Sequence, residues 1–384
     1  PLTGGRWILD ARRALRQARP SRATPDTAYS HQWEQSMGLF ILRRVGVMLL
    51  TALCLTYVVF FMTNLYPNLE KLAKTQGNFR MSDEAVASWL EKGGYLQSTP
   101  KKYLEWVGLA PSYQHVAADG AVTGRCIQPG MEPEDAPRFC GILQGYWGYS
   151  TVFRDEVASI IATRLGLTGY LMFWVMLIMV PAALILGVLA GMREGSGMDR
   201  SLSTVAITTT ATPEYVSGVL FIAIFSSSAV GLKWFKGTAT SAMENPNFEN
   251  FTLPVLTIVL YGMGYIARMT RASMTEVMTA QYIRTARLKG VSFHNIVLKH
   301  ALRNALIAPF TVIMLQFPWL LNGVVIVETL FNYKGFGWTL VQAAGNNDIE
   351  LLLGVSVVSV LVVLITQLIS DIGYVYLNPR IRIS

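Results

Sequence analysis

The residues with the clearest chemical character form a basic, polar stretch, Tyr282–Gly290, that lies between two apolar blocks. Gly290 interrupts a helical pattern, and a second one begins at Val291-Ser292 and continues to His300. Two short helices joined at a glycine indicate an element that seats in a groove of another protein. A basic loop with some helical propensity is the simpler alternative.

The chain lacks the sequence motifs of several enzyme classes. It holds no Gly-x-x-x-x-Gly-Lys-Ser/Thr loop, no His-Glu-x-x-His pair and no nucleophile elbow. Paired carboxylates within the apolar blocks are missing as well. We therefore expect no catalytic residues, no metal site and no cofactor bound by this chain. If the chain takes part in active transport, the energy must come from a separate subunit.

Ionisable and amide side chains inside apolar blocks are candidates for a translocation pathway, because burying them in a membrane is costly. The candidates are Glu214, Gln316, Asn322 and Glu328. Glu214 follows Pro213, so it can equally start a helix with an acid near the positive end of the helix dipole. Glu328 can equally hold an outer loop in place.

Composition places the elements that carry these residues in a membrane. Of the 384 residues, 52% are hydrophobic and 15% are charged, whereas a soluble domain has about 25% charged residues. The net charge of +8 does not indicate nucleic-acid binding, because no basic stripe with interleaved aromatic residues is present. Cytoplasmic loops of membrane proteins retain Lys and Arg.

Six apolar blocks are long enough for membrane helices, some of them with polar interruptions. They are 45–65, 167–192, 203–230 (broken at Pro213-Glu214), 253–267, 305–330 and 351–377. Within the second block, Gly187 and Gly191 predict close packing against another helix. We expect an all-α integral membrane protein with six spans.

Charge predicts the orientation of these spans. With both termini in the cytoplasm, 19 of the 32 Lys and Arg residues lie in cytoplasmic segments and three lie in the two short outer loops. Ten more lie in the 66–166 segment, but long loops translocate largely regardless of charge. We predict cytoplasmic termini.

The expected organisation is a cytoplasmic extension (1–38), a first transmembrane helix (39–65), an extracytoplasmic segment (66–166), a five-helix core (167–377) containing a cytoplasmic region (271–304), and a tail (378–384). The extension is either a membrane-surface helix or a solvated chain, and the first span is an uncleaved anchor. Ser82, Asp83 and Glu84 predict a short helix over 82–96. The 66–166 segment serves as a cap over the outer mouth or as a docking surface. Cys126 and Cys140 form either a disulfide or two free thiols there.

The run 282–309 resembles the coupling segment of ABC-importer permeases of the oligopeptide, dipeptide and nickel branch. Thr285-Ala286-Arg287 with Gly290 corresponds to that branch's signature, and Lys299 to Ile307 to its continuation. Ala308 separates Ile307 from Pro309, a small departure from the commonest form. Further similarities occur at 42–44, 148–150, 195–200, 253–254, 328–331, 335–337 and 378–382, so the resemblance covers about 39–384. After the first span, Tyr66-Pro67-Asn68 stands where the family often has Pro-Gly-Asp-Pro.

The resemblance implies a type I ABC-importer permease in the bacterial inner membrane, corresponding to the first permease of peptide-type systems. Its partners would be a second permease, two cytoplasmic ATPases that hold ATP and Mg, and an extracytoplasmic substrate-binding protein. Peptides are the default cargo, with nickel chelates, glutathione, opines and sugars left open. The implied coupling residues are Thr285, Ala286, Arg287, Gly290, Val291, Ser292, His294, Ile296 and His300.

Two other classes of function remain. A self-sufficient, ion-coupled secondary transporter predicts coupling carboxylates and inverted repeats, and neither is clear here. A membrane sensor that binds ligand through 66–166 would need a cytoplasmic signalling domain, and the sequence contains none.

Overall fold

The computed structural model describes residues 25–116, 122–127, 135–228 and 232–377. It divides into two units, Pro1–Val47 with Arg380–Ser384, and Met48–Pro379. Residues 1–24 and the predicted tail 378–384 lie outside the described residues.

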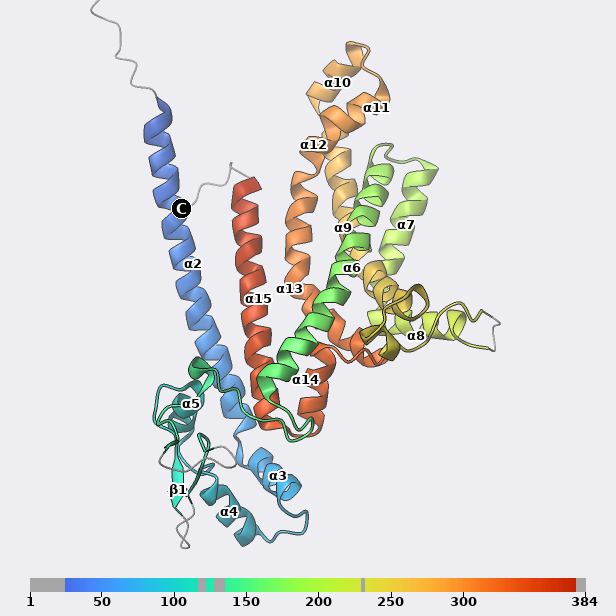
Figure 1. Ribbon diagram of the computed structural model, residues 1–384. Helices are drawn as coiled ribbons and strands as arrows, with labels where there is room; N and C mark the ends of the chain where they lie inside the picture. Colours follow the sequence, from blue (N-terminus) through green and yellow to red (C-terminus); the bar gives the residue numbers. More distant parts are fainter. Residues whose placement is uncertain (1–24, 117–121, 128–134, 229–231, 378–384) are drawn as a thin grey trace, which may run out of the picture. The chain divides into compact units, whose positions relative to one another are not determined.

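Helices account for most of the described chain (Figure 1). They are α2 (Pro25–Thr63), α3 (Tyr66–Gln76), α4 (Asp83–Lys92), α5 (Thr99–Val107), α6 (Val157–Gly191), α7 (Gly197–Ala211), α8 (Glu214–Phe225), α9 (Phe248–Thr279), α10 (Gln281–Leu288), α11 (Phe293–Asn295), α12 (Leu302–Ala305), α13 (Ile307–Leu330), α14 (Phe336–Gly345) and α15 (Ile349–Leu377). The strands are β1 (Gln114–Val116) and β2 (Val122–Gly124), which pair antiparallel. The remaining turns are η2 (Ile142–Gln144), η3 (Thr240–Met243) and the π-helical η4 (Ile296–Ala301).

Four described helical segments are long and apolar enough to cross a membrane: Ile41–Thr63, Val157–Gly191, Phe248–Thr279 and Ile349–Gly373. Two bent pairs bring the number to six if each pair is one span. The pairs are Gly197–Ala211 with Glu214–Phe225, bent by 103°, and Phe293–Ala305 with Ile307–Pro318, bent by 50°. The structure thus supports a mainly helical membrane protein with four to six spans, with the β1–β2 hairpin as an exception to the helical architecture.

The predicted block 203–230 is sharply broken. Thr212 has an extended backbone (φ −90°, ψ 119°), because the residue before a proline is disfavoured in the α conformation. Pro213 has no N–H to continue the preceding helix, so α7 ends at Ala211 and α8 begins at Glu214.

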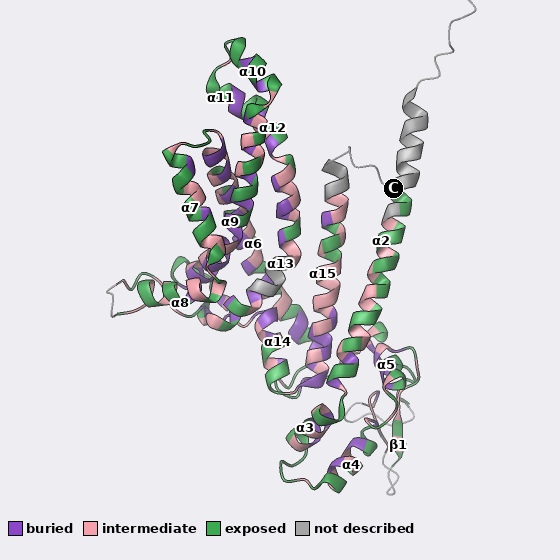
Figure 2. Cartoon of the chain, turned by 180° about the vertical axis from the view of Figure 1, so that it is seen from behind, coloured by how far each residue is buried: buried purple, intermediate pink, exposed green. Residues whose placement is uncertain are grey.

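Helix α9 lies at the centre of the main core, and Figure 2 shows buried residues along it and on the adjacent α6. Small residues bring these two helices together. A Cβ added to Gly187 would lie 2.4 Å from Thr270 Cβ and 2.6 Å from the carbonyl of Ala267. A Cβ on Gly191 would lie 2.6 Å from Met274 Cβ. The predicted close packing at Gly187 and Gly191 is confirmed, and its partner is α9.

The described part of the 66–166 segment contains α3, α4, α5, the β1–β2 hairpin, η2 and the first turns of α6, which begins at Val157 and not at the predicted 167. Its α4 begins where predicted, with the Ser82 hydroxyl accepting a hydrogen bond from Ala85 N (3.3 Å). The helix ends at Lys92 rather than near 96, because Gly93 and Gly94 follow and Gly94 has a φ of +73°. A disulfide joins Cys126 and Cys140, whose Cα atoms are 5.6 Å apart.

The 66–166 segment is attached to the start of α15. Arg125 makes a bidentate ion pair with Glu350, with both N–O distances 2.9 Å. Ser150 donates to Asp348 (2.6 Å), and Asn347 donates to the carbonyl of Asn68 (3.0 Å). Apolar residues of α3, α4 and α5 share one core with Phe60 of α2 and with the first turns of α15.

Candidate functional site

The predicted coupling residues fall on α10, α11 and η4 and in the turn between α10 and α11, beyond one end of α9 and α13 (Figure 1). Helix α10 follows α9 after a break at Ala280, whose backbone is extended (φ −64°, ψ 149°). Its apolar positions, Ile283 and Ala286, are buried, and its other side chains are exposed. Spacing of three residues places these two on one face, so α10 is amphipathic and presents its basic face outward.

Gly290 ends α10 in a Schellman motif. Its N–H donates to the carbonyl of Arg287 (3.0 Å), and Val291 N–H donates to the carbonyl of Ala286 (3.2 Å). Gly290 has a φ of +73°, which side-chain-bearing residues rarely adopt, although no atom lies within 4 Å of an added Cβ. The glycine is therefore needed for backbone conformation and not for space.

A small core fixes α10 and η4 to the end of α9. Its buried members are Met274, Met278, Ile283, Ala286, Ile296, Val297, Ala301 and Ala305. Polar contacts add to it: Asn304 Nδ2 donates to Tyr282 Oη (2.9 Å), and Ser273 Oγ donates to the carbonyl of Ala305 (2.8 Å). The segment is therefore joined to the end of α9 by both apolar and polar contacts.

The nine predicted coupling residues divide between this core and the surface. Ala286 and Ile296 are buried and Val291 is half-buried. The exposed ones are Thr285, Arg287, Gly290, Ser292, His294 and His300. The first group holds the segment together, and the second is accessible to a partner.

Apolar side chains on the same surface were missed by the sequence reasoning. Leu288 is 82% exposed, and Leu298 and Phe293 are 49% and 40% exposed. Leu288 is the last residue of α10 and lies between Arg287 and Lys289. An exposed leucine leaves water when a partner binds, so Leu288 is a candidate contact for a partner on this surface. The sequence contained one signal for this exposure: Leu288 stands at the end of the amphipathic pattern and does not fall on the face that holds Ile283 and Ala286.

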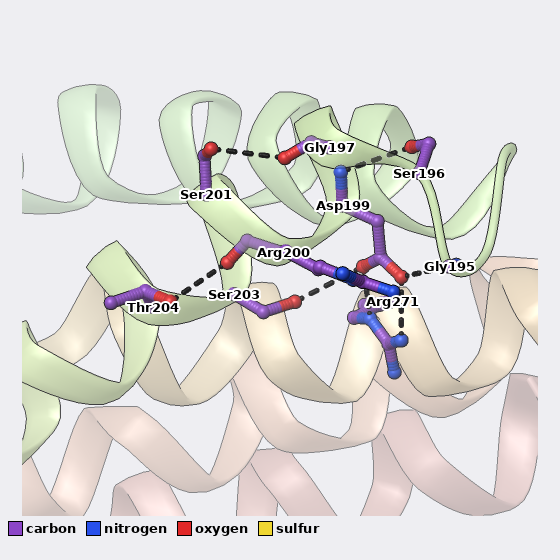
Figure 3. A network of polar contacts seen from close by, with 9 residues as sticks. All are labelled: Gly195, Ser196, Gly197, Asp199, Arg200, Ser201, Ser203, Thr204 and Arg271. Carbon is purple, nitrogen blue, oxygen red and sulfur yellow. Dashed lines mark hydrogen bonds and ion pairs between the residues drawn. The ribbon is translucent and has the colours of Figure 1, made fainter.

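A second network, also missed, ties α7 to α9 near the same end (Figure 3). Arg271 donates to Asp199 from Nε (2.5 Å) and Nη2 (2.8 Å). The Asp199 carboxylate also accepts from Gly195 N (2.8 Å) and Ser203 Oγ (3.1 Å). Because the Asp199 side chain is only 3% exposed, this ion pair fixes the start of α7 against α9.

The four pathway candidates lie on two helices, Glu214 on α8 and the other three on α13. Glu214 is half-buried in the first turn of α8, the position expected for a helix-starting acid. Gln316 is buried within α13. Asn322 is in α13, but its side chain lies outside the described residues.

Glu328 is fully buried at the end of α13. Its carboxylate accepts hydrogen bonds from Thr168 Oγ1 of α6 and from Trp338 N of α14 (2.9 Å). A Cβ on Gly335 would lie within 3 Å of the same carboxylate. Glu328 therefore holds α6, α13 and α14 together, the arrangement expected of a residue that fixes a loop.

Comparison with known proteins decides the family. The model of the binding-protein-dependent transport system inner membrane component family matches residues 183–383. This chain belongs to that family. The ABC-permease resemblance predicted from residues 282–309 is thereby confirmed.

Relatives of the permease agree with this assignment. It is 30% identical over 350 residues to "Probable peptide ABC transporter permease protein y4tP" of Sinorhizobium fredii, covering 90% of this chain and all of that one. It is 35% identical over 240 residues to a glutathione transport system permease protein of Escherichia coli, covering 62% of this chain and 76% of that protein. A solved structure of the MetNI methionine ABC transporter matches 56% of the chain at 18% identity, with a TM-score of 0.43.

Proposed function

We propose that this permease moves peptides or similar small solutes into the cell as one of two permease subunits in an ABC importer. Its relatives' names include peptide and glutathione permeases, and these names support peptides as the default cargo. In this proposal six spans cross the inner membrane, the termini are cytoplasmic and the 66–166 segment is outside. A second, related permease completes the pathway.

The 271–304 segment is the observation that carries the proposal. It presents a basic surface around the exposed Leu288, and its core joins that surface to α9. A cytoplasmic ATPase seated there would push on α10, and the movement would pass through α9 to the rest of the helices. One ATPase would contact this permease and a second would contact the partner permease.

ATP and Mg would be held by the ATPase subunits, and a substrate-binding protein outside the membrane would deliver the cargo. Of the pathway candidates, Gln316 and Asn322 lie along α13, which contacts α9 and α15. We assign the pathway to this part of α13 and give Glu328 the structural role of bracing α14 against α6.

Reconstitution tests the proposal. The chain, its second permease and both ATPases would be placed in proteoliposomes. The binding protein and a labelled tripeptide would be added on the side of the membrane that the outer face of the permease contacts. We expect uptake that requires ATP and the binding protein. Uptake driven by an ion gradient in vesicles containing this chain alone would instead support a secondary transporter.

A further inference from the structure

A cavity of about 690 Å³ lies between the 66–166 segment and the start of α15. This volume is within the range of small-molecule sites, about 300 to 1,000 Å³. Its lining includes residues from α2, α4, α5, β2 and α15, so several separate elements must fold together to form it. It is distant in sequence from the 271–304 segment and is not used by the proposed coupling.

One wall of the cavity carries two buried charges of opposite sign. Lys102 and Glu105, both on α5, are 8% and 7% exposed. Lys102 Nζ donates to Asn64 Oδ1 (3.1 Å) and to the carbonyl of Tyr95 (2.8 Å), which uses two of its three protons. Within the described part of the chain, no carboxylate lies within 4.0 Å of Lys102 Nζ.

Glu105 is poorly compensated in the same way. Its Oε1 has no hydrogen-bond partner among the described residues, and Lys101 Nζ lies 3.9 Å away. Lys101, the Tyr113 backbone and the Gln97 side chain favour the charged form of Glu105, but burial outweighs them and raises the pKa of this carboxyl. The charge is therefore only partly compensated by the described residues. A fold that keeps an ammonium and a carboxylate in one wall, without pairing them, is suited to a ligand that supplies the opposite charges.

Single atoms of three other side chains around the cavity also lack a hydrogen-bond partner. Within the described residues, Trp106 Nε1 and Arg125 Nε have no acceptor, and Gln97 Oε1 has no donor. Buried polar groups in folded proteins nearly always have a hydrogen-bond partner. Four of the five such atoms in the described chain belong to residues that line this one cavity, counting Glu105 Oε1.

Aromatic rings supply the apolar part of the lining. Trp89 stacks on Tyr95, with ring centroids 5.7 Å apart and planes 7° from parallel. The Arg125 guanidinium lies 5.6 Å from the centroid of the Tyr146 ring. The lining therefore combines aromatic rings with charged side chains of both signs.

We propose that the cavity binds a small zwitterion with an ammonium and a carboxylate, of the size of a di- or tripeptide. The ammonium would donate to Glu105 and Gln97. The carboxylate would accept from the free proton of Lys102 and from Trp106 Nε1. Small side-chain rotations would turn the unpaired atoms toward the ligand, since each residue already lines the cavity.

Calorimetric titration of the purified full chain in nanodiscs with trialanine tests the proposal. We expect saturable binding with one site, and about tenfold weaker binding of N-acetyl-trialanine amide, which has lost both charges. Glu105→Gln and Lys102→Met should each weaken trialanine binding about tenfold. Glu84→Gln, which removes an exposed carboxylate outside the lining, is the matched control and should bind as the unmodified chain does.

Thermal unfolding without ligand separates a binding defect from misfolding. We expect Glu105→Gln to unfold at or above the temperature of the unmodified chain, because it removes a buried carboxylate whose nearest cation is 3.9 Å away. Lys102→Met should unfold at a lower temperature, because the Asn64 and Tyr95 oxygens lose their donor, so its binding is measured below its own unfolding transition. No binding of trialanine, equal binding of the capped peptide, or equal binding by both cavity variants would overturn the proposal. Because the assay contains no ATPase and measures no transport, such a failure would leave the transport proposal standing.

Discussion

Truncation of the Leu288 side chain tests the proposed interface between this permease and its ATPase. Full burial of a leucine side chain contributes about 1.5–3 kcal/mol. Because Leu288 is 82% exposed in the free chain, most of that free energy remains available to a partner. Leu288→Ala should therefore weaken ATPase binding by about 1–2.5 kcal/mol, roughly 5- to 70-fold. The free energy of unfolding should change by less than about 0.5 kcal/mol, because the side chain makes little contact within the chain.

The assay is titration of the ATPase subunits onto the purified permease pair, followed by peptide uptake in proteoliposomes. Leu109→Ala is the matched control, since Leu109 is 59% exposed in the 66–166 segment, far from the proposed interface. We expect Leu109→Ala to bind and transport normally. ATPase affinity unchanged by Leu288→Ala would refute the assignment of this surface to the ATPase.

Four further substitutions test other parts of the structure. Asp199→Asn should lower the free energy of unfolding by about 2–3 kcal/mol. This loss is smaller than that for breaking a fully buried ion pair, because the side chain of the partner Arg271 is 32% exposed. An unchanged unfolding temperature would contradict the role of the ion pair. Gly290→Pro should abolish ATP-driven uptake while the protein still reaches the membrane, because proline cannot adopt a φ of +73°. Gly290→Asn should retain uptake, because asparagine tolerates that conformation. Normal uptake by the proline variant would disprove coupling through this turn. Gly187→Val should destabilise the chain by about 3 kcal/mol through overpacking against α9. Gly169→Val on the same helix should be neutral, because no atom lies within 4 Å of a Cβ added there. Equal effects of the two substitutions on stability would argue against close packing at Gly187. Burial raises the pKa of Glu105, despite opposing effects of Lys101, the Tyr113 backbone and Gln97, so the folded state holds this proton more tightly than the unfolded state. The free energy of unfolding should therefore fall as pH rises from about 4.5 through the raised pKa. Glu105→Gln should remove this pH dependence from unfolding curves recorded from about pH 4 to 7.5.

The sequence by itself determined the features that depend on neighbouring residues. Long apolar blocks predict membrane helices because each helix satisfies its own backbone hydrogen bonds. The cap of α4 at Ser82 and the glycine turn at Gly290 follow from local conformational preference. The run 282–309 identified the family for the same reason, since its pattern is continuous along the chain.

The local sequence pattern did not predict the angle of a helix bend or the exposure of a residue at a helix end. Pro213 predicted an interruption, but the 103° angle between α7 and α8 is set by what each packs against. The composition of α10 predicted a basic surface. Its exposed Leu288 became evident only when the buried face was fixed by Ile283 and Ala286.

The remaining features were decided by the tertiary structure alone. Asp199 and Arg271 are 72 residues apart, and their ion pair exists because α7 packs on α9. Glu328 reads as a pathway candidate in the sequence, yet folding places it between Thr168 and the start of α14. The cavity beside α15 is lined by residues of seven helices and strands, and its buried charges come together only when those elements pack. Sequence patterns report the preferences of a chain over a few turns, whereas burial and pairing depend on which distant side chains packing brings into contact.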